Sequence, residues 1–271
     1  MSFFPNSKTF IQIGSLSIAW YAICILTGAV IAYLLGRYNF KKIGYDPEVL
    51  SDYFFGVLFT GIIGARLWYV IFMWNELYAK NPLEIIMFRH GGLAIQGGLI
   101  TGVIFSLWYF KRHQIDYMVA GDAIMPGVLI AQAFGRWGNF FNQEAFGGPV
   151  SLDFLQSLHL PNFIIDGMHI NGVYYHPTFL YESLANIIGF LLIFFLIKKI
   201  QTKQGEQFFA YFIWYGITRY FIEGMRTDSL YVMGFRTAQL VSIVFLIVGI
   251  AGYIYVKKKG NPAIKPIELK G

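Results

Sequence analysis

Residues 135–148, GRWGNFFNQEAFGG, place charged and amide side chains at the end of a long apolar run. Arg136 is followed by Asn139, Asn142 and Glu144 within nine positions. Arginine is the side chain best suited to bidentate phosphate binding, because its planar guanidinium matches two oxygen atoms at once. The glycines around it, including Gly147, let backbone N–H groups approach a ligand closely. The stretch therefore indicates a site for an anion such as phosphate.

A second set of ionisable residues lies in the apolar segment 207–223. Tyr215, Arg219 and Glu223 are spaced four residues apart, so a helix places them within about 80° of one another on one face. Arg226 follows three residues later. Charged residues at membrane depth usually face a protein interior or a water-filled cavity, since exposure to lipid is costly. The face is a candidate site, and a structural Arg219–Glu223 pair that braces two helices is the alternative.

The segment RHGGLAIQGGLITG, residues 89–102, places two glycine pairs on either side of Gln96. Glycines four residues apart, such as Gly98 and Gly102, permit close helix packing. Packing does not explain His90 at the edge of the segment or the polar Gln96 within it. The pattern suggests a backbone that bends around a ligand.

Five further residues are candidates on weaker grounds. Arg66 lies within an apolar segment and not in a connection between segments, so a role in setting membrane orientation does not explain its position. Tyr21 lies at the outer end of another apolar segment, and an aromatic belt at the membrane surface explains it equally well. Tyr181 and Glu182 lie one turn into the segment that follows HPTF, with His176 at its surface as a candidate cap or surface residue.

The composition predicts that transmembrane helices position these residues. The chain has 271 residues, of which 56% are hydrophobic and only 13% are charged, against roughly 25% charged residues in soluble domains. Apolar stretches near 20 residues long recur along it, and each can cross a hydrocarbon core as a helix. We expect an all-α integral membrane protein, one polytopic domain over residues 1–271, with seven transmembrane helices at about 17–36, 49–72, 91–110, 118–135, 177–197, 207–223 and 235–256.

The positions of Lys and Arg predict the orientation of these spans. Thirteen of the 21 basic residues lie in the connections 37–42, 111–112 and 198–203 and in the tail after the last span. These connections follow spans one, three, five and seven, so the positive-inside rule places the N-terminus outside and the C-terminus in the cytoplasm. The basic clusters are topology signals and not a nucleic-acid surface. The longest connection, 136–176, should form a small extracytoplasmic head.

Metal and disulfide chemistry are not indicated. Cys24 is the only cysteine and lies inside the first span, so neither a disulfide framework nor a thiolate metal cluster is expected. The N-terminus shows no basic region followed by a short apolar core and a cleavage site, so no removable signal peptide is expected. We expect no cofactor and no metal.

Five blocks in this order resemble the prolipoprotein diacylglyceryl transferase family: GARLWYV (64–70), HGGLAIQGGL (90–99), GRWGNFFNQEAFG (135–147), HPTFLYE (176–182) and YGITRYFIEGMR (215–226). The resemblance spans almost the whole chain. It implies transfer of a diacylglyceryl group from phosphatidylglycerol to the lipobox cysteine of a prolipoprotein, which forms a thioether and releases glycerol phosphate. It places the reaction at the outer face of the bacterial cytoplasmic membrane, with the prolipoprotein signal peptide and the lipid as partners.

The resemblance also implies roles for individual residues. Arg136 and Arg219 match arginines associated with phosphate binding and departure, and Tyr215 and Glu223 match the polar helix face of the family. The expected lipid-binding set is Arg136, Asn139, Asn142, Glu144, Gly147, Arg66, Gln96, Tyr21 and Arg226. Structural or substrate contacts are expected of His90, His176, Tyr181 and Glu182.

One position departs from part of the family. Some members have a histidine at the position of Gln96, proposed as the base that activates the cysteine. Glutamine has no titratable group near neutral pH and is not a base. We therefore expect a mechanism in which the thiol, with a pKa near 8.5, is already a few per cent thiolate. The arginines would stabilise the charge that develops on the leaving phosphate, and Gln96 would orient a ligand.

Other classes of membrane protein fit the sequence less well. A transporter for an anionic metabolite or lipid is the alternative, but its arginines should lie near the midplane and be reachable from both sides. An intramembrane protease needs a motif that is absent, since residues 120–122 read AGD and HExxH does not occur. A retinal-binding receptor needs a lysine inside the last span, and every lysine lies outside the predicted spans.

Overall fold

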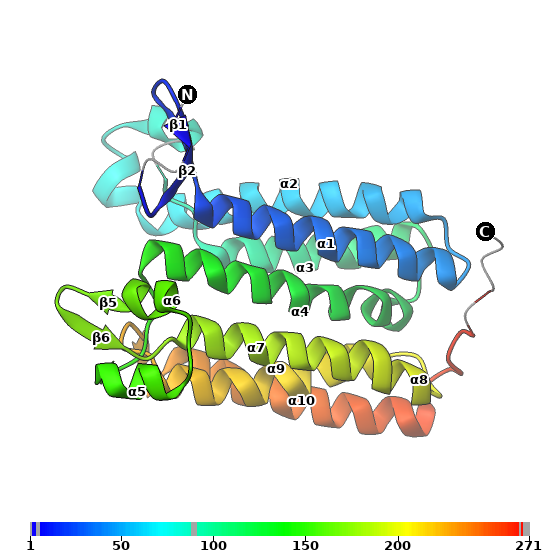
Figure 1. Ribbon diagram of the computed structural model, residues 1–271. Coiled ribbons are helices and arrows are strands. Elements are labelled where there is room, and N and C mark those ends of the chain that lie inside the picture. The colour runs from blue at the N-terminus through cyan, green and yellow to red at the C-terminus, as the bar shows by residue number, and fades with distance from the viewer. Residues whose placement is uncertain (1, 4–5, 88–90, 266, 268–271) are drawn as a thin grey trace. The chain divides into compact units, whose positions relative to one another are not determined.

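The computed structural model describes residues 2–3, 6–87, 91–265 and 267, and most of them are helical (Figure 1). His90, one of the predicted site residues, lies outside the described residues. Over the described residues, five helical runs are long and apolar enough to cross a membrane. These are α1 (Trp20–Lys42), α2 (Pro47–Phe72), α4 (Tyr117–Asn142), the continuous run of α7 (Thr178–Leu191), η4 (Leu192–Ile197) and α8 (Lys198–Ile200), and α10 (Thr237–Lys259).

The two remaining predicted spans are also helices but are less apolar. They are α3 (Ile95–Arg112) and α9 (Glu206–Met225). α9 carries the polar face predicted from the sequence, and its charges lower the hydropathy of the whole helix. The chain is therefore a mostly helical membrane protein, with five spans by length and composition within its described residues, and the count of seven stays a prediction.

In the part of the chain that the structure describes, three small antiparallel sheets accompany the helices, so the prediction of an all-α chain is wrong in detail. One tight turn in each sheet contains a glycine with positive φ, at Gly14, Gly172 and Gly234, a conformation that L-residues rarely adopt. The turns fall outside the long apolar segments, where the helical pattern stops. The sheets are β1 (Ser2–Phe3), β2 (Thr9–Ile13) and β3 (Leu16–Ala19); β4 (Pro149–Val150), β6 (Val173–Tyr175) and β5 (His169–Ile170); and β7 (Tyr231–Val232) with β8 (Phe235–Arg236).

Several helix boundaries differ from the predicted ones. α1 continues through the predicted connection 37–42, because Lys41 and Lys42 in its last turn are favourable near the negative end of a helix. α4 continues to Asn142 and ends where Gln143 adopts a left-handed φ of 53°. The head therefore begins at residue 143 and not at 136, and Arg136 lies on a helix.

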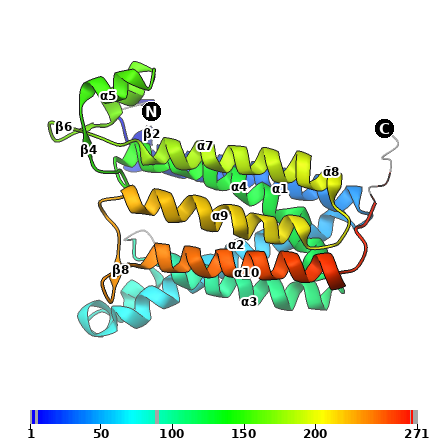
Figure 2. The same ribbon diagram turned by 90° about the horizontal axis from the view of Figure 1, so that it is seen from below.

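The chain divides into two compact units. The first combines the chain up to Gly36 with Gly121–Lys265, and the second runs from Arg37 to Ala120. Within the first unit, α4, α7, α9, α10 and the first part of α1 run side by side (Figures 1 and 2). Close backbone approach supports this packing: a Cβ at Gly28 of α1 would lie 2.9 Å from the Ala131 Cα of α4.

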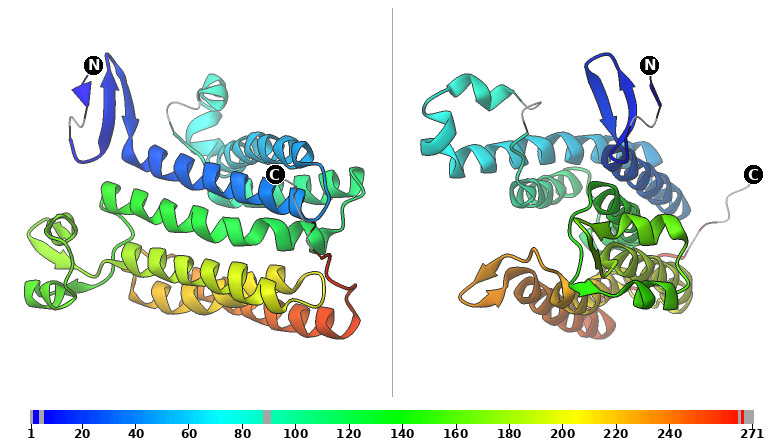
Figure 3. Two further views of the ribbon diagram at one scale, coloured as in Figure 1. Left: turned by 45° about the vertical axis from the view of Figure 1, so that its right-hand side comes forward. Right: turned by 60° about the vertical axis from the view of Figure 1, so that its left-hand side comes forward.

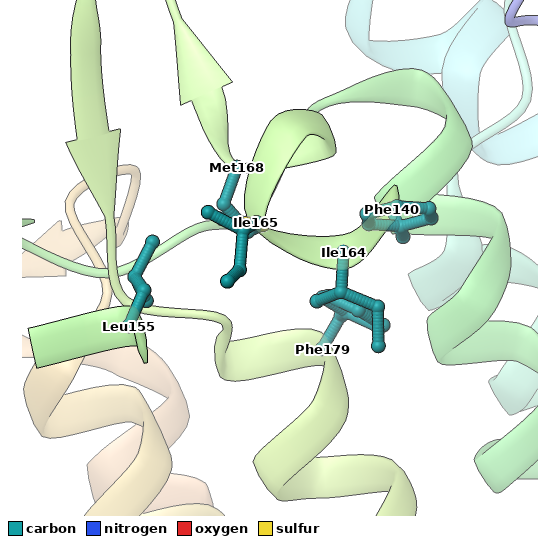
Figure 4. Close-up of a cluster of buried hydrophobic side chains, with 6 residues drawn as sticks. All are labelled: Phe140, Leu155, Ile164, Ile165, Met168 and Phe179. Atoms are coloured by element: carbon teal, nitrogen blue, oxygen red, sulfur yellow. The ribbon is translucent and has the colours of Figure 1, made fainter. Parts of the chain in front are cut away.

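The head, residues 143–177, lies between the end of α4 and the start of α7 (Figure 3). It contains α5 (Leu152–Ser157), α6 (Asn162–Gly167) and the sheet of order β4-β6-β5. Its buried cluster joins Leu155, Ile164, Ile165 and Met168 to Phe140 of α4 and Phe179 of α7 (Figure 4). Because the cluster includes side chains from both helices, it holds the end of α4 beside the start of α7.

A buried polar cluster holds the opposite end of α9. Asp122 on α4 accepts hydrogen bonds from the backbone N–H groups of Gly205 (2.7 Å) and Phe208 (2.9 Å). These donors belong to the first turn of α9, where no partner exists within the helix. Glu206 is fully buried and pairs with Lys257 Nζ of α10 at 2.8 Å. α9 is thereby tied to α4 and α10 at the end away from Arg219.

In the second unit, α2 and α3 pack through glycines. A Cβ at Gly97 of α3 would lie 2.2 Å from the Gly64 carbonyl oxygen of α2, so the two backbones touch where these glycines meet. Thr101 fills the adjacent space and donates to the Thr60 carbonyl at 3.1 Å. The glycines of this segment thus serve helix packing at Gly97.

Candidate active site

Three helices of the first unit contribute charged side chains to a single cluster. Arg136 of α4 pairs with Glu182 of α7, with Nη2 and Oε1 2.8 Å apart. Arg219 of α9 binds the other oxygen of the same carboxylate, with Nη1 and Oε2 2.9 Å apart. The Glu182 side chain is only 6% exposed. Two guanidinium groups therefore bind one buried carboxylate, each through a different oxygen atom.

The cluster continues along α9. Arg219 Nη2 binds Glu223 Oε2 at 2.6 Å, which is the i, i+4 pair expected from the sequence. Beyond the end of the helix, Arg226 donates from Nε and Nη2 to the two oxygens of Asp228, both at 2.9 Å. Burial raises the pKa of Asp228, but the hydrogen bonds and charge of Arg226 outweigh it and hold that pKa below its usual range. Arg226 is thus held beside the cluster by a bidentate pair.

The end of α4 adds a second chain of hydrogen bonds. Arg136 Nη1 donates to Asn139 Oδ1 at 3.2 Å, and Asn139 Nδ2 donates to Glu144 Oε1 at 2.9 Å. Asn142 Nδ2 donates to the same Glu144 oxygen at 3.2 Å. Tyr21 of α1 lies within electrostatic range of both Glu144 and Arg136. The predicted lipid-binding residues of this stretch are therefore brought together around Arg136.

A small cavity adjoins this chain of hydrogen bonds. It has a volume of about 10 Å³ and is lined in part by Asn139, Gln143 and Glu144. That is the lower limit for one water molecule, so neither a headgroup nor a thiol fits inside. Glu144 is otherwise exposed, and a substrate group must approach it from its exposed side.

Gly147 joins the head to the end of α9. Its N–H donates to the His176 carbonyl at 3.1 Å, and the N–H of Gly148 donates to the Met225 carbonyl at 3.1 Å. A Cβ at Gly147 would lie 2.6 Å from the His176 Cβ, so no larger residue fits without movement. Gly147 also forms an isolated bridge with Arg226. Its role in the structure is close backbone packing that places the head against α9.

The other predicted residues of the first unit lie around the cluster. Tyr215 is one helical turn before Arg219, and its electrostatic neighbours include Arg219, Glu182 and Arg136. His176 Nδ1 and the Tyr181 hydroxyl are 3.3 Å apart. The two residues therefore support each other at the start of α7.

Two predicted residues belong to the second unit. The three guanidinium nitrogens of Arg66 donate to backbone carbonyls, among them Ile85 O (3.0 Å), Gly92 O (2.9 Å) and Glu84 O. Arg66 is 3% exposed and supports the segment that leads into α3. Gln96 is exposed in the first turn of α3. Lipid contacts of Arg66 and Gln96 stay predictions.

The sequence understated some residues and missed others. Glu182 was expected only as a structural or substrate contact, yet it links both arginines. One turn along each helix lie further polar residues, Gln132 on α4 and Asn186 on α7. Gln132 Nε2 donates to the Tyr211 hydroxyl at 2.9 Å, whereas Gln132 Oε1 and Asn186 Nδ2 are buried without a partner among the described residues. Spacing of i, i+4 from Arg136 and Glu182 is the signal that could have found them.

The arrangement suits anion chemistry. Within residues 2–3, 6–87, 91–265 and 267, no group of three His, Cys, Asp or Glu side chains is placed to hold a metal ion. The cluster instead offers guanidinium N–H donors, which bind phosphate oxygens in pairs and stabilise charge on them. Arginines and carboxylates that pair between its helices make this a helical membrane protein with an ionic cluster at its candidate site.

Comparison with known proteins identifies the family. A family model described as prolipoprotein diacylglyceryl transferase matches residues 8–255. The phosphatidylglycerol–prolipoprotein diacylglyceryl transferase of Staphylococcus haemolyticus is 46% identical over 94% of this chain and 90% of its own length. Those of Staphylococcus aureus and Staphylococcus xylosus are each 47% identical, over 93% and 88% of this chain and 90% and 85% of their own lengths. The chain belongs to the prolipoprotein diacylglyceryl transferase family, which confirms the resemblance seen in its sequence blocks.

Proposed function

We propose that this chain transfers the diacylglyceryl group of phosphatidylglycerol to the lipobox cysteine thiol of prolipoproteins, forming a thioether and releasing glycerol phosphate. Family membership supports the reaction. The observation that carries it is the convergence of Arg136 and Arg219 on the buried Glu182 carboxylate. A site that holds two guanidinium groups around one carboxylate is prepared for another anion with two oxygens.

The charges of the site match a phosphodiester. Arg136, Arg219 and Glu182 together carry a net charge of +1, and the phosphodiester of phosphatidylglycerol carries about −1 at neutral pH. Glu182 keeps the two arginines at a fixed separation, so their other N–H donors need little reorganisation to bind phosphate oxygens beside it. Such preorganisation is the main source of electrostatic stabilisation in enzymes.

The transfer step follows from these contacts. The cysteine sulfur attacks the glyceryl carbon that bears the phosphate, and the carbon–oxygen bond to the phosphate breaks. The electron pair goes to the phosphate oxygen, where Arg136 and Arg219 stabilise the added charge. Loss of one donor from such an arrangement typically lowers kcat by about 10²–10³-fold. Tyr215 and Glu223 complete the polar face, and Glu223 orients Arg219 through the 2.6 Å pair.

The proposed topology has seven spans, with α3 and α9 added to the five apolar ones. The distribution of Lys and Arg supports an N-terminus outside and a C-terminus in the cytoplasm. The site then opens toward the outer face of the bacterial cytoplasmic membrane. Phosphatidylglycerol and the prolipoprotein signal peptide are the proposed partners, and Arg66 is assigned to support of the segment before α3.

Transfer to a peptide tests the function. Purified protein is incubated with phosphatidylglycerol labelled in its acyl chains and a lipobox peptide, with the Cys→Ser peptide as control. We expect label on the cysteine peptide alone and free glycerol phosphate in equal amount. Arg136→Ala should fold and be inactive. Absence of transfer, together with uptake of an anionic solute into vesicles, would instead establish the transporter.

A second variant tests the role of Gln96. Gln96→Ala should weaken lipid use if the amide orients a ligand. Full activity of this variant would remove Gln96 from the site.

A further inference from the structure

The thiol proton needs an acceptor, and the structure assigns this role to Glu144. The inference rests on the proposed transferase function, because it concerns the cysteine thiol that attacks the lipid. Gln96 has no titratable group that could serve. Glu144 was predicted only as a lipid-binding residue, so the inference gives it a different role.

The other carboxylates of the cluster are engaged by arginines. Both oxygens of Glu182 bind Arg136 and Arg219, and Glu182 is 5% exposed. Glu223 is 3% exposed and binds Arg219. A carboxylate that must release two arginines before it takes a proton is a poor base.

Asp228 is exposed but is also engaged. Both of its oxygens accept hydrogen bonds from Arg226 at 2.9 Å. Glu144 differs from all of these, because it forms no ion pair with another described residue and its side chain is exposed. It is the carboxylate of the cluster that a thiol can reach.

Glu144 is also held in place with one oxygen left for the proton. Asn139 and Asn142 both donate to Oε1, whereas Oε2 accepts no hydrogen bond from any described residue. Its own N–H donates to the Asn139 carbonyl at 3.1 Å. Two hydrogen bonds through Asn139 connect Glu144 to Arg136. The base and the phosphate-binding arginine therefore keep a fixed relation during the reaction.

The step balances without another reactant. The S–H proton moves to Glu144 Oε2 while the sulfur electron pair forms the bond to the glyceryl carbon. The carbon–oxygen bond to the phosphate breaks, and its electron pair stays on the phosphate oxygen beside the arginines. Because Glu144 is exposed, its proton then passes to water and the carboxylate is restored.

Other ionisable groups surround this segment and provide comparisons. His176 is the other side chain at this segment of a type that can accept a proton near neutral pH, and it already contacts the Tyr181 hydroxyl. Tyr21 carries a phenol, which is protonated at neutral pH, so it serves as a non-basic comparison. The charged and titratable groups on the elements packed around residues 143–147 include Tyr21 on α1, Arg136 on α4, Tyr175 on β6, His176 before α7, Glu182 on α7, Arg219 and Glu223 on α9, and Arg226 and Asp228 after α9.

The decisive variant is Glu144→Gln, which keeps an oxygen to accept from both asparagines but removes the base. Transfer rates of wild type and variant are compared from pH 6.5 to 9. Loss of a general base typically costs about 10²–10⁴-fold, and we expect a deficit of that order at pH 7. Without the base, the reaction depends on free thiolate, which rises about tenfold per pH unit below a thiol pKa near 8.5. The ratio of wild-type to variant rates should fall accordingly.

Two further measurements distinguish loss of the base from a folding defect in Glu144→Gln. A peptide with selenocysteine in the lipobox has a nucleophile already ionised at neutral pH, so it should bring Glu144→Gln to within about threefold of wild type. Glu144→Asp keeps a carboxylate, so its deficit should not change with pH. Tyr21→Phe and His176→Asn should show no deficit that shrinks with pH.

The outcomes separate the two proposals. A Glu144→Gln deficit that is constant with pH and is not rescued by selenocysteine would give Glu144 a structural role and overturn the inference, as would unchanged activity. If Glu144→Gln does not fold, a Glu144→Asp deficit that shrinks with rising pH would overturn it. Wild-type protein that transfers no lipid at any pH would instead reject the proposed function.

Discussion

Replacing Arg219 by lysine keeps a positive charge in the cluster but removes its forked geometry. Arg219 binds two carboxylates on two helices, Glu182 through Nη1 at 2.9 Å and Glu223 through Nη2 at 2.6 Å. A lysine ammonium is a compact point charge on a flexible stem and does not reproduce this fork. One of the two hydrogen bonds is therefore lost, and one buried carboxylate oxygen loses its partner.

The size of the effect follows from this geometry. A hydrogen bond to a charged group contributes about 1.5–3 kcal/mol. The Arg219 side chain is 11% exposed and both partners are more buried, so water screens the loss only slightly. If the same contact stabilises the leaving phosphate, kcat/KM should fall by about ten- to hundredfold. A purely structural pair would lower the unfolding temperature and leave the activity of the folded fraction near wild type.

The assay is transfer of labelled diacylglyceryl to the lipobox peptide, normalised to folded protein from thermal unfolding in detergent. Arg37→Lys is the matched control, because Arg37 pairs with Glu48 at an exposed position and such pairs contribute little. We expect that control to stay within about twofold of wild type. Folded Arg219→Lys with turnover within about threefold of wild type would refute the bidentate role of Arg219.

Three other substitutions test the structure. Gly147→Ala should lower the unfolding temperature, with a cost of about 1–3 kcal/mol for overpacking, whereas Gly148→Ala faces open space and should not; equal effects would contradict the packing role. Because Arg226 lowers the pKa of Asp228, the stability that Asp228 adds is present above the unfolded pKa near 3.9 and disappears as pH falls through the lower folded value. The difference in unfolding temperature between wild type and Asp228→Asn should therefore be constant above about pH 5 and shrink toward pH 3, and a difference that grows on acidification would be inconsistent. Asn186→Leu removes an amide whose Nδ2 is buried without a partner among the described residues, so the unfolding temperature should stay equal or rise; a clear fall would show that Nδ2 has a partner in the working protein.

Hydropathy was enough to predict helical, membrane-spanning character, because lipid forces a spanning segment to satisfy its backbone hydrogen bonds internally. Boundaries were harder to predict. α1 continues through a basic stretch and α4 continues through Arg136, since charges near a helix end do not stop a helix. The small sheets escaped prediction because their described strands are all two to five residues long and carry little periodic signal.

Residue type and spacing alone determined the Arg219–Glu223 pair, because i and i+4 are neighbours on any helix. The same reasoning selected Arg136, Asn139 and Asn142, because charged and amide side chains are unusual at the end of an apolar run, and the structure links them through hydrogen bonds with Glu144. What only the tertiary structure decided is which carboxylate lies between the two arginines. Glu182 comes from a third helix, and its place depends on the head that holds α4 beside α7. Side-chain contacts between distant segments depend on packing, which no local pattern of residues specifies.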